Sequence, residues 1–315
     1  MNKFIKISIS FIIFGLVLIG LATYLNNGHI PRFSSNSEKK NYTVSVNDVK
    51  NLDIDIIDSD VTLEENTSSS NIEIEYYTDI EREILITHTD KKLSIKENKK
   101  TFGVVIDFSI FSKKQEIKIK IPKSSSIDVH SLNKMGDLII KDLNIKHLTA
   151  NSKIGNVYLT NVSTLDTEIK LSTGDLKINN FKSENNPLKI KTATGNIKLN
   201  NISGISNLNI DNNTGDIDLS SSTIKNINIS NKLGNITLNN LPNESTDNIN
   251  LETNTGDISL FNLTANNSIS LKSSTGNILA ELNDNESNFT NGSNKKKTLF
   301  TSSSTGTVTV KFLNK

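Results

Sequence analysis

The chain has 315 residues, no cysteine and no tryptophan, and aromatic residues make up only 5% of it. The missing cysteine excludes disulfides, thiolate chemistry, cysteine zinc sites and a lipid-modified N-terminal cysteine. Residues 1–32 carry three basic residues and no acidic one, so the remainder has 32 basic against 34 acidic residues, a charge of −2. A nearly neutral body lacks the basic surface that nucleic-acid binding needs, and we expect no nucleic-acid partner.

Residues 1–28 predict a membrane anchor. The apolar run of residues 5–25 has Lys3 and Lys6 at its start, and no charged residue lies between Lys6 and Arg32. About 18–20 apolar residues cross a bilayer core of ~30 Å. The lysines favour a cytoplasmic N-terminus, which places the body of a single-pass protein outside the cytoplasm, at the cell membrane.

A cleaved signal peptide is the alternative interpretation of this segment. The apolar region of a signal peptide is normally about 7–15 residues long, and the small residues Gly20 and Ala22 could serve a peptidase. Both interpretations export the protein. Residues 29–40 follow as a polar linker without apolar periodicity.

Residues 41–125 predict a small N-terminal β-module. Apolar and polar residues alternate there with period two, which is typical of half-buried strands, and we expect these strands to be antiparallel. The polar stretches 66–71, 90–92 and 112–115 predict hairpin connections, and Pro122 ends the last strand. The alternating segments read YTVSV, LDIDIID, VTLEE, IEIEYY, ILITHT, KLSIKE, VVIDFSIF and EIKIKIP.

The module also contains a phenylalanine-rich stretch, with Phe102, Phe108 and Phe111. We expect these side chains to fill the join between the module and the following domain. An exposed hairpin that binds a partner is the alternative.

From residue 126 to residue 315 a glycine returns about every twenty residues and opens the same short phrase, such as TGDLKI or TGNIKL. Such a period is typical of stacked-repeat proteins, in which each unit buries its apolar side only against its neighbours. The glycine supplies the positive φ of a turn. The repeated glycines are Gly136, Gly155, Gly174, Gly195, Gly215, Gly234, Gly256, Gly276 and Gly306.

Alignment on these glycines places aliphatic residues two and four positions after each glycine, and seven and five positions before most of them. Each coil therefore contributes two short strands with inward apolar pairs. The predicted fold class is all-β. It is a parallel β-solenoid of about nine coils of ~20 residues, preceded by the antiparallel module and one N-terminal transmembrane helix.

Two polar columns support this register. Six positions after the glycines stand mostly Asn, which predicts a ladder of side-chain amides from coil to coil. One position after them Asp and Asn alternate, which keeps the carboxylates two coils (~10 Å) apart. A row of calcium sites is the alternative, but one Asp per two coils supplies too few ligands. We therefore expect no metal site.

Residues 281–298 interrupt the stack and predict a solvated loop. Lys295, Lys296 and Lys297 lie in this loop with Phe289. Contact of these residues with an anionic glycan or lipid is the alternative.

The stretch EIKIKIPKSSSIDVHSLNKMGDLII, followed by repeated ST-G-D/N-I-x-L coils, resembles the bacterial putative-adhesin family of unknown function, also called the toastrack domain. The resemblance covers about residues 45–315. It implies a secreted or membrane-anchored β-solenoid, often linked to cell-envelope stress systems, and it brings no catalytic residue.

These observations predict a non-enzymatic cell-envelope protein that presents a rigid β-solenoid for adhesion or for binding an envelope glycan or membrane protein. A membrane-anchored regulator of an envelope-stress system is one alternative. A polysaccharide-cleaving β-helix enzyme is another. In the outward row six positions before the glycines, however, His130, Glu168 and Lys189 are scattered across separate coils, and the outward carboxylates form no recurring pair for acid–base chemistry. We assign no catalytic, cofactor-binding or metal residue, because His29, His88, His130 and His147 lack a second ligand at metal spacing.

Overall fold

The computed structural model describes residues 37–78, 82–99, 115–123, 125–241, 246–263, 267–283 and 298–313, together with Phe11, Phe14, Gly15 and Val17. The chain divides into two units, Met1–Ser37 and Glu38–Lys315. No helix among the described residues is long and apolar enough to cross a membrane. The anchor predicted over residues 5–25 lies almost wholly outside the described residues and stays a prediction, as does the role of the phenylalanine-rich stretch.

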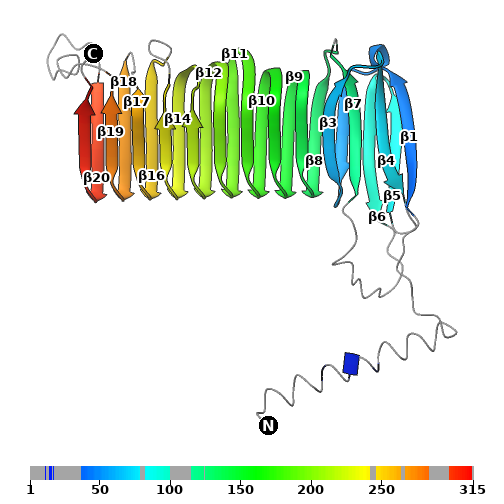
Figure 1. The fold of residues 1–315 in the computed structure, drawn as a ribbon, viewed down its shortest axis with the longest axis horizontal. Coiled ribbons are helices and arrows are strands. Elements are labelled where there is room, and N and C mark those ends of the chain that lie inside the picture. The colour runs from blue at the N-terminus through cyan, green and yellow to red at the C-terminus, as the bar shows by residue number, and fades with distance from the viewer. Residues whose placement is uncertain are drawn as a thin grey trace. The chain divides into compact units, whose positions relative to one another are not determined.

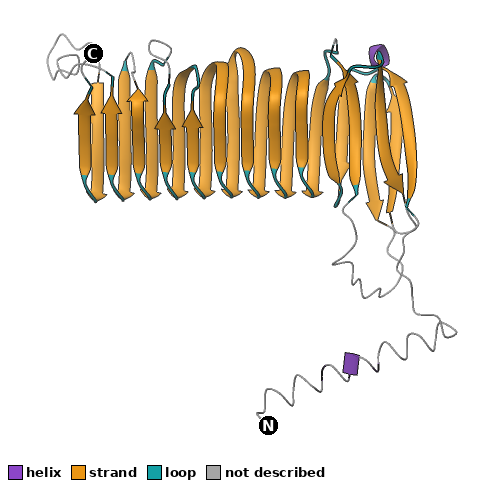
Figure 2. Ribbon diagram, in the orientation of Figure 1, coloured by secondary structure: helices purple, strands orange, loops and turns teal. Residues whose placement is uncertain are grey.

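The second unit is a stack of strands joined by hydrogen bonds into one sheet (Figures 1 and 2). One short 3-10 helix, Val46–Asp48, accompanies them. The strands are β1 (Glu38–Ser45), β2 (Asn51–Ile56), β3 (Asp60–Asn66), β4 (Asn71–Thr78), β5 (Arg82–Thr89), β6 (Lys92–Lys99), β7 (Glu116–Pro122), β8 (Asp128–Met135), β9 (Leu138–Ile154), β10 (Val157–Thr173), β11 (Leu176–Thr194), β12 (Ile197–Thr214), β13 (Ile217–Ser220), β14 (Ile224–Leu233), β15 (Ile236–Asn239), β16 (Asn248–Thr255), β17 (Ile258–Leu263), β18 (Ser268–Thr275), β19 (Ile278–Leu282), β20 (Thr298–Thr305) and β21 (Val308–Phe312).

The all-β parallel solenoid is confirmed. Strand segments that follow the glycines pair in parallel from β9 through β12, β13, β15, β17 and β19 to β21. Segments that precede the glycines form a second parallel ladder, from β8 to β20. We call the outward surfaces of these ladders the post-glycine face and the pre-glycine face. Ile217 and Leu219 lie inside the stack, 0% and 1% exposed, as predicted.

The stack has about seven regular turns, and the prediction of about nine coils was slightly too high. Eight glycines, from Gly136 to Gly276, bound seven intervals of 19–22 residues. The next interval, to Gly306, spans 30 residues and includes residues outside the described part of the chain. Counting glycine corners therefore overstates the number of regular turns, because each turn lies between two corners.

The prediction of a purely antiparallel N-terminal module was wrong. Only the pairs β1–β4, β4–β7 and β5–β6 are antiparallel among the described strands of this region. β2 pairs in parallel with β6 and β8, and β3 pairs in parallel with β7 and β9. The solenoid thus continues back to residue 51. The sequence could not show this, because period-two alternation is the same in strands of either direction.

The predicted hairpins had different outcomes. The connection at Asp90 and Lys91 joins the antiparallel strands β5 and β6, and both residues have positive φ, 49° and 63°. In contrast, residues 66–71 join β3 to β4, which pair with β7 and not with each other. The connection at 112–115 lies outside the described residues except for Gln115, and Pro122 ends β7 as predicted.

The first corner of the solenoid, between β2 and β3, contains no glycine, and a buried carboxylate holds it instead. Glu97 accepts hydrogen bonds from the backbone N–H groups of Ile57 (2.7 Å) and Asp58 (2.9 Å), and from the Ser59 hydroxyl (3.0 Å). The Glu97 side chain is fully buried, and the Arg82 guanidinium lies 3.4 Å from it. The charge of Glu97 is thereby compensated.

The glycine corners form the short loops along one edge of the stack (Figure 2). The repeated glycines have φ between +119° and +148°, which confirms the predicted positive φ. From Gly136 to Gly276, the residue after each repeated glycine accepts a backbone hydrogen bond from the next coil through its Oδ1 atom, as Asp216 does from Asn235 N–H at 2.8 Å. Asp and Asn both offer this acceptor, so the column alternates without losing the bond.

The predicted amide ladder is also present, and it marks a second corner. Asn180 donates to Asn161 at 2.8 Å, and Asn201 donates to Asn180 at 2.7 Å. All members of this column have left-handed backbone, with φ between 51° and 57°. Asn and Asp tolerate this conformation better than other non-glycine residues do. The column comprises Asp142, Asn161, Asn180, Asn201, Ser221, Asn240 and Asn262.

Candidate functional site

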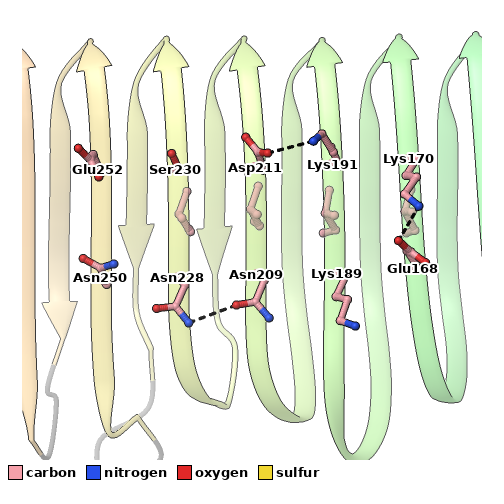
Figure 3. Close-up of a pocket in the computed structure, with 14 residues that line it drawn as sticks. Glu168, Lys170, Lys189, Lys191, Asn209, Asp211, Asn228, Ser230, Asn250 and Glu252 are labelled. Atoms are coloured by element: carbon pink, nitrogen blue, oxygen red, sulfur yellow. Dashed lines mark hydrogen bonds and ion pairs between the residues drawn. The ribbon is translucent and has the colours of Figure 1, made fainter.

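A shallow groove of about 330 Å³ crosses the pre-glycine face from β10 to β16 (Figure 3). Strand alternation turns the residues six and four positions before each glycine outward, and these side chains line the groove in two rows. The row six positions before the glycines contains Glu168, Lys189, Asn209, Asn228 and Asn250. The row four positions before them contains Lys170, Lys191, Asp211, Ser230 and Glu252.

The charged groups in the groove form pairs. Lys170 Nζ lies 2.7 Å from a Glu168 carboxylate oxygen on the same strand, and Lys191 Nζ lies 3.4 Å from Asp211 on the next strand. The hydrogen bond from Lys170 lowers the pKa of Glu168, and the charges of Lys170 and Lys189 act in the same direction. Glu168 therefore stays ionised at neutral pH and holds no proton to donate.

Side-chain amides line the groove on β12, β14 and β16. Asn228 donates to Asn209 at 3.2 Å, as the dashed line in Figure 3 shows. A parallel amide row runs beside it, in which Asn226 donates to Asn207 at 3.1 Å and Asn248 donates to Asn226 at 2.8 Å. An amide in such a ladder uses one N–H and one lone pair, so the others point to solvent and repeat at the strand spacing of ~4.8 Å.

The carboxylates of the groove do not converge on one point. These carboxylates, on Glu168, Asp211 and Glu252, lie on three different strands, and two of them pair with lysines within the groove. The described residues contain no group of three or more His, Asp or Glu side chains able to hold a metal ion. Glycoside cleavage needs two carboxyl groups that converge on one bond, with one of them protonated.

The three histidines that the structure describes lie apart from the groove. His88 Nε2 contacts the Asp48 carbonyl at 2.9 Å, and His130 is exposed on β8. His147 on β9 is the register partner of Asp128 and Asp166. His29, and the loop with Phe289 and Lys295–Lys297, lie outside the described residues.

Sequence reasoning considered Glu168 and Lys189 only as scattered residues, and the structure places them side by side as register partners. It missed the row that includes Lys170, Lys191 and Asp211. A signal for this row was present, because a residue two positions along a strand from an outward residue also points outward.

Comparisons with known proteins give a family and several similar structures. The family model described as Toastrack DUF4097 matches residues 49–311. No curated protein matches the chain. A putative adhesin from Parabacteroides merdae is 15% identical, with 89% of this chain and 98% of that chain covered and a TM-score of 0.46. A putative adhesin from Parabacteroides distasonis is 14% identical, with coverages of 87% and 98% and a TM-score of 0.41. A putative lipid binding protein from the same organism is also 14% identical, with coverages of 88% and 98% and a TM-score of 0.38.

Proposed function

The chain belongs to the Toastrack DUF4097 family, and from this premise we propose that it is a non-enzymatic cell-envelope protein whose rigid β-solenoid binds an envelope component. The observation that carries the proposal is the groove on the pre-glycine face. Its side chains repeat at the strand spacing, and the backbone ladders beneath them fix their positions.

A repeating surface suits a repeating partner. Each coil offers one or two hydrogen-bonding or charged side chains, which individually bind a ligand weakly. A glycan polymer that contacts several coils at once gains affinity through linked binding events, without new contact types. We therefore propose an envelope glycan as the partner.

The proposed location follows from the N-terminal segment. Residues 5–25 have the length and apolarity of a single membrane span, and Lys3 and Lys6 favour a cytoplasmic start. In this proposal the span holds the solenoid at the outer surface of the cell membrane, within reach of envelope polymers.

The test is retention of the full chain, in detergent micelles, on isolated cell envelopes. We expect the protein to sediment with the envelopes and to release no soluble sugar. Replacing Asn209, Asn228 and Asn250 together by Ala should weaken retention by about tenfold, because three ligand hydrogen bonds are lost.

The matched control is the pair Thr237→Ala and Ser259→Ala, which removes polar groups from the post-glycine face of neighbouring coils. Equal retention of the triple variant and the control would exclude the groove as the binding surface. Sugar release that disappears in Glu168→Gln would overturn the non-enzymatic assignment.

A further inference from the structure

The post-glycine face carries a pair of like charges. Lys177 on β11 and Lys198 on β12 are register partners, and both are exposed. Neighbouring parallel strands lie ~4.8 Å apart, so the two side chains leave the sheet about 5 Å from each other. Within the part of the chain that the structure describes, neither ammonium group forms an ion pair.

A second pair of neighbouring lysines differs from this one, because carboxylates lie close to both of its ammonium groups. Lys170 and Lys191 are also register partners, but each has a carboxylate, at 2.7 and 3.4 Å. Like charges that face each other on adjacent strands destabilise a sheet. Asp218 on β13 is the register partner of Lys198, but among the described residues no carboxylate lies within ion-pair distance of either ammonium group. The repulsion between Lys177 and Lys198 therefore leaves an unfavourable term that a bound anion would reduce.

The row continues with an aromatic residue. Tyr158 on β10 is half-buried and is the register partner of Lys177, so these two side chains leave the sheet next to each other and Lys198 follows one strand further on. Burial raises the pKa of the Tyr158 hydroxyl, and the carboxylates of Asp137 and Asp175 raise it further. A phenol with the ordinary pKa of 10.0 is already protonated near neutral pH, so the Tyr158 hydroxyl can donate a hydrogen bond there.

Polar uncharged side chains stand next to this row. Asn179 and Asn200, two residues beyond the lysines on the same strands, are register partners and half-buried. Ser220 donates to Asn200 at 3.0 Å. The face thus combines two cationic groups, an aromatic ring and neighbouring amides, which can contact the anionic group, the apolar face and the hydroxyls of an acidic sugar.

We propose that Tyr158, Lys177 and Lys198 form a binding site for one anionic group, a phosphate or a carboxylate, carried by an envelope glycan. The two ammonium groups bind the anion, and the Tyr158 ring packs against the adjoining sugar. This site rests on the proposed function, which supplies the class of partner, an envelope glycan. The site adds two statements to that function: the glycan is anionic, and it contacts a second face of the solenoid.

The test measures binding of the full chain, in detergent micelles, to three soluble polymers by isothermal titration. Poly(glycerol phosphate) supplies phosphate, polygalacturonate supplies carboxylate, and dextran supplies neutral sugar. Lys177→Gln with Lys198→Gln should weaken binding of at least one anionic polymer by about tenfold at low salt and leave dextran binding unchanged. The polymer that loses more affinity identifies the anionic group.

The matched control is Lys225→Gln with Lys311→Gln, which makes the same change in net charge on other coils. Lys225 lies 3.9 Å from Asp247 and Lys311 lies 3.1 Å from Glu281, so both are paired. This control should retain wild-type affinity. Equal losses in the two double variants, or no loss in either, would overturn the site.

Two further results separate the ring from the lysines and the site from the proposed function. Tyr158→Ala should weaken binding and Tyr158→Phe should largely restore it, because packing needs the ring; equal affinity of both variants and wild type would remove Tyr158 from the site.

Retention on envelopes that is insensitive to the lysine changes, with no binding of either anionic polymer, would overturn the site and leave the proposed function standing. Binding of an anionic polymer through Lys177 and Lys198 without retention on envelopes would support the site and overturn the proposed function.

Discussion

Single residues decide the shape of the two corners of each coil. At Gly215, φ is +132°, and a Cβ atom would lie 2.1 Å from the carbonyl oxygen of Gly195 in the preceding coil. Glycine is required there by the close approach of two backbones as well as by φ. At Asn180, φ is 54° and the side chain joins an amide ladder, so an amide residue serves the corner better than glycine would.

The glycine corner gives the first prediction. Gly215→Val should destabilise the protein by roughly 3 kcal/mol or more, because the β-branched side chain opposes both the positive φ and the Gly195 carbonyl. Asp216→Asn should change stability by less than about 0.5 kcal/mol, because the amide keeps the Oδ1 acceptor. Urea unfolding of both variants measures the difference, and similar midpoints would contradict the role given to the corner.

The inward rows give the second prediction. Leu219 is 1% exposed and lies between Leu199 and Leu238 in the ladder, whereas Asp218 is exposed. Leu219→Asp should cost roughly 3–5 kcal/mol, because it buries an unpaired carboxylate. Asp218→Ser should cost less than about 0.5 kcal/mol. Equal sensitivity of the two positions in denaturant melts would show that the register is wrong.

At the scale of elements, the most informative feature is the junction between β3 and its two neighbours. Glu64 on β3 pairs with Lys118 on β7 at 2.7 Å and with Lys141 on β9 at 2.9 Å. One carboxylate therefore links a strand of the N-terminal region to the first repeat coil. Burial acts to raise the pKa of Glu64, but the hydrogen bonds and charges of Lys118 and Lys141 outweigh it and lower the pKa below the ordinary 4.5.

This junction gives the third prediction. Because the pKa of Glu64 is lowered in the folded state, its contribution to stability is complete above pH 4.5 and is lost as the pH falls through the folded value. Glu64→Gln should lower the melting temperature at pH 7 and reduce the further fall in melting temperature as the pH drops below 4.5. Asp218→Asn is the control, since Asp218 is exposed and forms no ion pair with any described residue. Equal pH dependence in Glu64→Gln and wild type would exclude the linkage.

At the scale of the whole molecule, stability is a sum of contacts between adjacent coils. Strands such as β11 pair on both sides, with β10 and β12, whereas β21 pairs only with β19 among the described strands. Val308 on β21 is 38% exposed, while its register partner Ile278 is 1% exposed. In a stack whose strands contact only their neighbours, the strands paired on one side therefore open before the strands paired on both sides.

Hydrogen exchange measures this gradient and gives the fourth prediction. Backbone amides of β10 and β11 should exchange at least about tenfold more slowly than those of β20 and β21. Opening a central strand breaks its pairing with two neighbouring strands, whereas opening β21 breaks its pairing with one. The comparison is made in the full chain by mass spectrometry of peptides from each strand. Uniform protection along the stack would show that it opens as one cooperative unit.

The sequence by itself determined the repeat, its inward aliphatic columns and both corner ladders. Each of these depends on which residue returns at a fixed position, and a column such as Ile217 and Ile236 has the same environment in every coil. The outward rows of the groove were also implied by alternation, although only one of them was recognised. The partners within those rows were not implied, because the Lys191–Asp211 pair joins residues 20 positions apart in the sequence.

The tertiary structure alone decided three features. It set the parallel pairing of β2 and β3, since alternation does not encode strand direction. It placed Asn212 and Asn231 inside the stack, where both donate to the carbonyl of Gly215, although their polarity suggested the surface. It also brought Glu97 to the corner between β2 and β3, which contains no glycine and lies about 40 positions away in the chain. In each case a contact between distant segments determines the environment, and a local pattern carries no information about such a contact.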